Sequence, residues 1–216
     1  MDIPVYLVAG FLDSGKTSFI NGILEDGFAR EDRTLLICCE EGDEEYEKKA
    51  LDNVTVVTVD DEEELTLAFC KELEKKHRPK QVLIEYNGMW QLQQLFQNLP
   101  DDWAVYQEMF FADATTFLQY NANMRSLVVD KLNTCELVVF NRFGKDMDKM
   151  EFHKIVRGVS RRTDIAYEYA DGHVEYDEIE DPLPFDVNAP VIRLADTDYA
   201  CLLYTSPSPR DRSLSR

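Results

Sequence analysis

The sequence predicts an α/β fold in which helices flank a mostly parallel sheet. Two observations carry this prediction, and the composition is consistent with a globular protein. Short apolar runs alternate along the chain with longer amphipathic segments, which is the order expected of repeated strand–helix units. The apolar runs are nearly continuous, so both faces of the sheet are expected to be covered. The hydrophobic and charged fractions, 44% and 30%, are those of an ordinary globular protein.

The apolar runs predict strands over residues 5–9, 34–39, 54–59, 81–85, 108–112 and 137–140. Amphipathic segments between them predict helices over residues 16–24, 62–76, 90–98, 122–131 and 148–160. In the second of these helices, helical spacing assigns four side chains to the core: Leu65, Ala68, Phe69 and Leu73.

The pattern changes after Ser160. Alternating apolar and polar residues around Asp171-Gly172 predict a β-hairpin, followed by a proline-rich connection and one more strand over 191–195. This region is either an edge addition to the sheet or a linker. From Cys201 the chain is rich in Ser, Pro and Arg and resembles the translation of a sequencing adapter. We therefore predict a main domain over 1–160, an extension or linker over 161–200, and a non-native tail over 201–216 that replaces the natural C-terminal part.

Charge and cysteine content exclude several classes of protein. The net charge of −19 argues against a nucleic-acid binder, because phosphate backbones would be repelled. No apolar run reaches the roughly 18 residues of a membrane span, and the N-terminus lacks the basic region of a signal peptide. The five cysteines have no disulfide-scaffold spacing, so reduced thiols in the cytoplasm are expected.

Residues 10–17, GFLDSGKT, match G-x-x-x-x-G-K-[ST] at every fixed position. An apolar strand precedes this loop and an amphipathic helix follows it, as phosphate binding requires, because backbone N–H groups and the helix N-terminus then converge on the phosphate oxygens. This predicts a P-loop NTPase fold. The expected nucleotide contacts are Gly10, Asp13, Ser14, Gly15, Lys16, Thr17 and Ser18.

Acidic residues follow two of the predicted strands, at the edge of the sheet where ligands bind. Glu85 ends the apolar run 81–85, and Glu40 follows the run 34–39, with Glu41 and Asp43 close behind. Lys16 and Glu85 are the expected catalytic residues, and Thr17, Glu85 and Glu40 the expected Mg²⁺ ligands. For each acid taken singly, a solvated surface position is the other interpretation. Asp113 is a further acid at a strand end.

Three segments in consistent order resemble the CobW-type (CobW/HypB/UreG-like) GTPases. The loop and helix over residues 10–24 are similar to the G-F-L-x-[AS]-G-K-T-[TS] element of that family. The run VLIEYNG is similar to its strand ending in E-[ST]-[ST]-G, through Glu85 and Gly88. The run ELVVFNR is similar to the strand that leads into the base-recognising N-K-x-D, through Asn141. The resemblance implies GTP as the nucleotide and work as a metallochaperone, with zinc or cobalt as cargo.

Two departures from the family pattern limit which properties of the family can be expected of this chain. The C-x-C-C motif expected between residues 40 and 81 is absent, and Cys70 is the one cysteine in that interval. Zn²⁺ therefore rests on the resemblance alone. In place of N-K-x-D stand residues 141–144, NRFG, so the aspartate that pairs with guanine is missing. Asp146, two residues further on, substitutes only if the loop bulges.

The resulting hypothesis is a cytoplasmic, Mg²⁺-dependent GTPase that switches conformation to act on a protein partner in metal homeostasis. The alternative is a regulatory module gated by GTP or ATP, which controls a transporter or another complex and barely hydrolyses nucleotide. Neither hypothesis involves nucleic acid or a membrane span. The oligomeric state stays open, with a dimer as one option.

Overall fold

The sheet of this protein is continuous from one edge to the other and parallel except at its last strand. The computed structural model describes residues 2–40, 46 and 53–179, all of which belong to one unit spanning residues 1–179. Eight strands run in the order β3-β2-β4-β1-β5-β6-β7-β8. All neighbours are parallel except β7 and β8, which are antiparallel. The predicted P-loop NTPase fold, with a mostly parallel sheet and a C-terminal hairpin, is confirmed.

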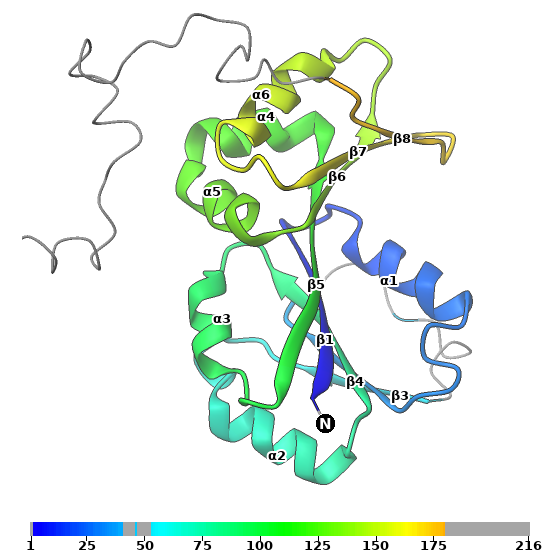
Figure 1. The fold of residues 1–216 in the computed structure, drawn as a ribbon, viewed down its shortest axis with the longest axis vertical. Coiled ribbons are helices and arrows are strands. Elements are labelled where there is room, and N and C mark those ends of the chain that lie inside the picture. Colours follow the sequence, from blue (N-terminus) through cyan, green and yellow to red (C-terminus); the bar gives the residue numbers. More distant parts are fainter. Residues whose placement is uncertain (1, 41–45, 47–52, 180–216) are drawn as a thin grey trace, which may run out of the picture. The chain divides into compact units, whose positions relative to one another are not determined.

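The bounds of the elements follow (Figure 1). The strands are β1 (Ile3–Gly10), β2 (Thr34–Cys38), β3 (Val54–Thr58), β4 (Gln81–Asn87), β5 (Trp103–Asp113), β6 (Leu137–Phe143), β7 (Asp164–Tyr169) and β8 (Val174–Tyr176). The helices are α1 (Lys16–Glu25), the 3₁₀ turn η2 (Glu62–Glu64), α2 (Leu67–His77), α3 (Leu92–Asn98), α4 (Ala114–Asn123), α5 (Arg125–Thr134) and α6 (Lys149–Arg157).

Helices cover both faces of the sheet, but unequally. Five helices, α2 to α6, lie on one face, and among the described residues α1 packs on the other (Figure 1). Ile20 and Leu24 of α1 are buried against Val8, Leu36 and Leu83 of the central strands. The short loop between β1 and α1 is thereby fixed at the carboxyl edge of the sheet, next to the central strands β4 and β5.

Two predicted helices have the wrong bounds, and in both cases a capping residue explains why. The segment predicted as one helix over 62–76 divides into η2 and α2, because the Thr66 hydroxyl accepts a hydrogen bond from the Phe69 N–H and starts a new helix. Leu65 and Leu73 are buried as predicted, but Ala68 is exposed. The helix predicted over 122–131 overlaps mainly α5, and the sequence reasoning missed most of α4, which begins after its cap Asp113.

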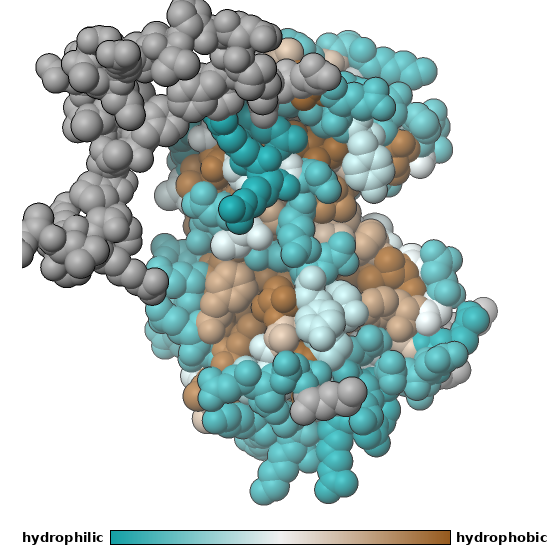
Figure 2. All heavy atoms as spheres, viewed as in Figure 1, coloured by the Kyte–Doolittle hydropathy of each residue, from teal (hydrophilic) through white to brown (hydrophobic). Residues whose placement is uncertain are grey.

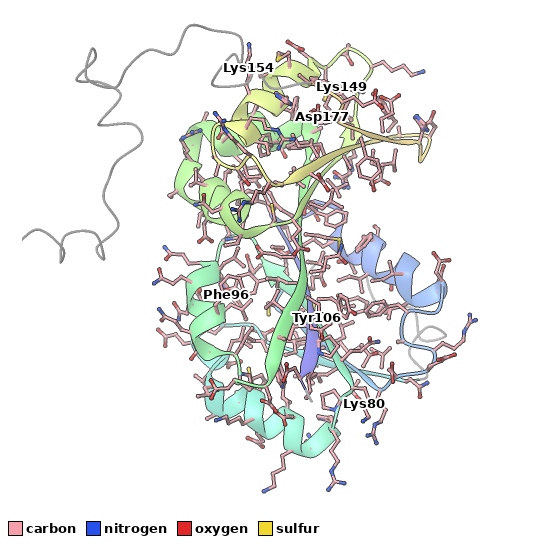
Figure 3. All side chains as sticks on the ribbon, in the orientation of Figure 1. Lys80, Phe96, Tyr106, Lys149, Lys154 and Asp177 are labelled. Atoms are coloured by element: carbon pink, nitrogen blue, oxygen red, sulfur yellow. The ribbon has the colours of Figure 1, made fainter. Side chains whose placement is uncertain are left out.

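The hairpin after Ser160 adds two strands to the edge of the sheet. Strand β7 pairs with β6, and β8 pairs with β7. The Asp177 carboxylate, which lies just after β8 and is labelled in Figure 3, contacts His153 Nδ1 at 2.7 Å and accepts a hydrogen bond from the Tyr167 hydroxyl at 2.8 Å. The contact with His153 attaches the hairpin to α6, and the bond from Tyr167 closes the hairpin on itself. The boundary at residue 160 stays a prediction, and the strand and tail predicted over 191–216 lie outside the described residues.

Apolar side chains reach the surface beside the first half of β5. Among the described strands, β6 pairs with residues 109–113 of β5 and leaves the earlier residues unpaired on that side. Val105 and Tyr106 are 39% and 60% exposed there. Figure 2 shows apolar side chains grouped in the middle of this face, and Figure 3 labels Tyr106 on β5 and Phe96 on α3. Over its first half, β5 therefore pairs with β1 only among the described strands, and the two halves of the sheet meet at residues 109–113.

A buried carboxyl lies between β5 and α5. Glu108 is 5% exposed and accepts a hydrogen bond from the Thr134 hydroxyl at 2.7 Å. Nearby, the fully buried Lys131 donates to the Trp90 carbonyl and to Asp130. Burial raises the pKa of Glu108 to about 7. The folded protein therefore holds the Glu108 proton more tightly than the unfolded chain does.

We expect this carboxyl to make the unfolding free energy depend on pH. Its stabilising contribution is complete below the unfolded pKa of about 4.3 and is lost as the pH rises through about 7. Glu108→Gln keeps an oxygen for Thr134 and removes the titration. The decrease in unfolding free energy between pH 5 and pH 8 should be about 2–3 kcal/mol smaller in this variant. Denaturant titrations of both proteins at the two pH values measure it, and equal decreases would contradict the assignment.

Candidate nucleotide-binding site

The loop between β1 and α1 has the backbone that phosphate binding requires. Gly15, the residue before α1, has φ of 85°, and a Cβ placed on it would lie 2.3 Å from Asn141 Nδ2. Both facts demand glycine at this position. Gly10 ends β1 and Asp13 adopts φ of 56°, so the chain turns tightly into the helix. The first N–H groups of α1 consequently face the inside of the loop, as anion binding requires.

Lys16 lies inside this loop and is 2% exposed. Its ammonium donates a hydrogen bond to the Phe11 carbonyl at 2.8 Å and forms an ion pair with Glu40. Burial raises the pKa of Glu40, and the Lys16 charge offsets only part of that rise. The structure thus brings together the predicted Lys16 and Glu40, while Glu41 and Asp43 lie outside the described residues.

Glu85 is the centre of a second cluster of polar contacts. The parallel register places it beside Val8 of β1 and Cys38 of β2, where it is 2% exposed. Its Oε1 accepts a hydrogen bond from the Thr17 hydroxyl at 2.7 Å, and its Oε2 contacts Cys38 Sγ at 3.3 Å and the Tyr46 hydroxyl. Thr17 and Glu85, predicted as metal ligands, are therefore in direct contact.

The donor set at Thr17 and Glu85 fits Mg²⁺. A hydroxyl and a carboxylate are hard oxygen ligands, and Mg²⁺ in nucleotide sites takes only one or two protein groups beside phosphate and water. The loop also fits a phosphate chain, because Ser14 Oγ is buried and has no hydrogen-bond partner among the described residues. Such an orphaned polar group is costly unless a ligand or water satisfies it.

Asn141, at the end of β6, joins the sheet to the loop. Its Nδ2 donates to the Ser14 carbonyl at 2.6 Å, and its Oδ1 is buried without a partner among the described residues. The neighbouring Arg142 adopts φ of 51° and donates to the Asp13 carbonyl and to Asp113 Oδ2, both at 2.7 Å. Asp113 therefore supports Arg142 and caps α4, and its sequence-based interpretation as a site acid has no support in these contacts.

A pocket of about 370 Å³ opens beside Asn141. The start of α1, the end of β6, the end of β7 and the turn of the hairpin surround it. Its walls include the predicted residues Gly15, Ser18 and Asn141. They also include an aromatic pair from α1 and β5, Phe19 and Phe111, whose ring centroids are 4.7 Å apart. The flat face of an aromatic base fits such walls, and the loop that would hold its phosphates adjoins them.

Sequence reasoning missed three residues of this region: Tyr46, Arg142 and Glu168. Tyr46 contacts Glu85 from within the acidic segment after β2, and Glu168 lines the pocket from β7. No local motif marks either of them. Arg142 had a signal, since it stands where N-K-x-D has lysine, but its contact with Asp13 spans 129 positions of the sequence.

The described cysteines are buried thiols rather than a metal centre. Cys38, Cys39, Cys70 and Cys135 are all free and buried. Burial raises the pKa of Cys38 and of Cys70 to about 11 and that of Cys135 to about 12. Within residues 2–40, 46 and 53–179, no group of three or more His, Cys, Asp or Glu side chains could hold a metal ion. These residues therefore give no chelate for Zn²⁺.

The whole of this architecture agrees with one family. Residues 4–165 match the family model described as CobW/HypB/UreG, nucleotide-binding domain. The chain belongs to this family. The predicted resemblance is confirmed, and the match covers well over half of the 216 residues. No curated protein matches the sequence. None of the described helices is long and apolar enough to cross a membrane.

Two solved structures share the fold. The Zn(II)-bound YjiA GTPase from E. coli is similar with a TM-score of 0.56 and 18% identity, over 76% of this chain and 57% of YjiA. The hydrogenase maturation factor HypB from Archaeoglobus fulgidus is similar with a TM-score of 0.51 and 13% identity, over 79% of this chain and 82% of HypB. This chain therefore spans little more than half the length of YjiA.

The close approach of β4 to the loop yields a test. A Cβ on Gly88 would lie 2.5 Å from the Gly10 carbonyl oxygen and 2.6 Å from the Phe11 nitrogen, so backbone would have to move. We expect Gly88→Ala to cost about 1–3 kcal/mol of stability and to weaken binding of a fluorescent GTP analogue. Gly22→Ala in α1 is the matched control, because nothing lies within 4 Å of its Cβ.

Gly22→Ala should instead stabilise the protein by about 0.5–1 kcal/mol and leave nucleotide binding unchanged. Thermal denaturation and analogue titration of both variants make the comparison. Similar behaviour of the two variants would mean that contact between β4 and the loop does not shape the site.

Proposed function

We propose that this protein binds and hydrolyses GTP with Mg²⁺ in the manner of a CobW-type metallochaperone. The observation that carries the proposal is the contact at 2.7 Å between the Thr17 hydroxyl and the Glu85 carboxylate. It joins the last residue of the phosphate loop to the acid at the end of the neighbouring strand β4. Lys16 lies in the same loop, so a cation, a metal-binding pair and free N–H groups converge on one point of the sheet edge.

Each group has a definite role in this proposal. The loop N–H groups and Lys16 bind the phosphates and neutralise charge that develops as the terminal phosphoryl group leaves. Thr17 and Glu85 hold Mg²⁺, which when bound polarises the phosphates. Glu85 cannot reach into solvent, since it is 2% exposed, so it acts on the metal or on a positioned water through short contacts. Glu40 is the third proposed metal ligand.

One contact favours the alternative of a regulatory module with negligible hydrolysis. Glu40 pairs with Lys16, and the acidic segment of residues 41–52 follows directly. A terminal phosphate would compete with Glu40 for Lys16, so nucleotide binding alone would break this ion pair. Such a device controls a transporter or another protein without turnover, with either GTP or ATP as the ligand.

The remaining elements of the proposal rest on the family. YjiA is a GTPase whose structure contains bound Zn(II), which supports Zn²⁺ as cargo and a role in metal homeostasis. A cytoplasmic location, a protein partner that receives the switch, and a possible dimer belong to the same proposal. Two large apolar side chains at the nucleotide edge, Leu12 and Met89, are 53% and 52% exposed and favour contact with a protein.

A competition titration tests the nucleotide. A fluorescent GTP analogue bound to the full chain in Mg²⁺ is displaced by GTP or by ATP, with Lys16→Ala as control. We expect GTP to bind at least about tenfold more tightly than ATP, which corresponds to about 1.4 kcal/mol. Lys16→Ala should weaken binding about 10- to 100-fold, because it removes a charge-assisted bond to phosphate. Thr17→Ala should remove most of the Mg²⁺ dependence. Equal competition by ATP would reject guanine selectivity.

Phosphate release under single-turnover conditions separates the enzyme from the regulatory module. If the protein is a GTPase, Glu85→Gln should lower the rate about a hundredfold or more while the analogue still binds. If the wild-type protein releases no phosphate above the Lys16→Ala background, the alternative holds.

A further inference from the structure

The guanine-reading acid of this family is missing from its usual place. Gly144 occupies the position of the aspartate in N-K-x-D, so no carboxylate extends from that residue. Yet the pocket beside Asn141 contains a carboxylate from another strand. Glu168 lies near the end of β7, and it lines the pocket together with Asn141 and Tyr169.

The pleat of β7 explains why Glu168 faces the pocket. Side chains alternate along a strand, and Ala166, two residues earlier, is buried in the apolar cluster that α1 covers. Tyr167 is buried in the cluster on the opposite face. Glu168 therefore lies on the α1 side of the sheet, where the phosphate loop and Ser18 also lie.

Glu168 is available for a ligand. It is half-buried, and its carboxylate has no hydrogen bond or ion pair with any of the described residues. Arg142, the cation in the pocket wall, directs its Nη1 to the Asp13 carbonyl and to Asp113 and forms no ion pair with Glu168. Beside it, Asn141 is 8% exposed and its Oδ1 is a buried acceptor without a partner within the described part of the chain. Two acceptors in one pocket point to a ligand with N–H donors.

The rival acid, Asp146, is poorly placed. It is exposed, and it is not among the residues that line the pocket. Its Oδ1 would lie 2.7 Å from a Cβ on Gly144, so it stays in its own turn, where the Met147 N–H bonds to the Gly144 carbonyl. The loop after β6 is therefore folded on itself and does not carry Asp146 to the pocket.

We propose that Glu168 is the residue that reads guanine in this protein. The inference rests on the proposed function and adds the residue that selects the base. Guanine presents two adjacent donors, N1–H and the 2-amino group, which match the two oxygens of a carboxylate. Adenine presents the lone pair of N1 at the same place, and a carboxylate would repel it. A half-buried carboxylate facing this edge favours guanine through charge-assisted hydrogen bonds.

The test compares GTP, ITP, XTP and ATP on the wild-type protein and on Glu168→Gln. ITP lacks the 2-amino group, and XTP has an oxygen in its place. In the wild-type protein we expect GTP to bind at least about tenfold more tightly than ITP, since one charge-assisted bond is lost. In Glu168→Gln, the affinity for GTP should fall about tenfold or more, and the difference in affinity between GTP and ITP should largely vanish. The affinity for XTP should rise, because the carboxamide N–H donates to its 2-oxo group.

Three controls make the outcome decisive. Glu168→Asp keeps the charge on a shorter side chain and should retain the preference for GTP over XTP. This variant shows whether substitution at this position by itself, for example through a folding defect, alters the affinities. Asp146→Asn should leave all four affinities unchanged. The ratio of the affinity for GTP to the affinity for GDP should be the same in the wild-type protein and in Glu168→Gln, because the base contact does not involve the phosphates.

The possible failures are distinguishable. If GTP binds in a Lys16-dependent way but Glu168→Gln leaves the relative affinities of GTP, ITP and XTP unchanged, the inference is overturned and the proposed function stands. A shift caused by Asp146→Asn instead would transfer the role to Asp146. If the wild-type protein shows no Lys16-dependent GTP binding, the proposed function fails, and the inference with it.

Discussion

The buried carboxylate of Glu85 is the constraint on which the nucleotide edge of this protein depends. A carboxyl group that is 2% exposed is costly to bury unless neighbouring groups form hydrogen bonds with it. Here the partners come from three different places: Thr17 from the start of α1, Cys38 from β2, and Tyr46 from the segment after it. The same contacts that satisfy the charge fix the phosphate loop relative to the central strands. Stability and site geometry therefore have a common cause.

A second attachment acts on the other side of the loop. Asn141 holds the Ser14 carbonyl and Arg142 holds the Asp13 carbonyl, so β6 fixes the middle of the loop as β4 fixes its end. Arg142 adopts a backbone conformation that non-glycine residues rarely use, and its two hydrogen bonds offset that strain. The loop is preorganised from both sides by strands that lie far from it in the sequence.

This arrangement explains what the sequence could predict and what it could not. The loop motif, the strand before it and the acid at the end of β4 are local patterns, and they predicted the fold class and the first candidates. The bond from Asn141 to Ser14 spans 127 positions, and Glu168 meets the pocket only because β7 pairs with β6. Helix bounds failed where a single capping side chain, Thr66 or Asp113, outweighed the apolar periodicity.

The parallel sheet also explains how an acid on β7 can take the place of the acid that the family motif has after Asn141. Adjacent parallel strands end at one edge, so the end of β6 and the end of β7 with its hairpin turn border the same pocket. A carboxylate contributed by either strand borders this pocket, provided that the pleat turns it to the α1 side. The absence of the motif aspartate after Asn141 is therefore weak evidence against guanine recognition. The informative question is whether an acid at that edge is available to a ligand. Glu168 lines the pocket, and its carboxylate has no partner within residues 2–40, 46 and 53–179.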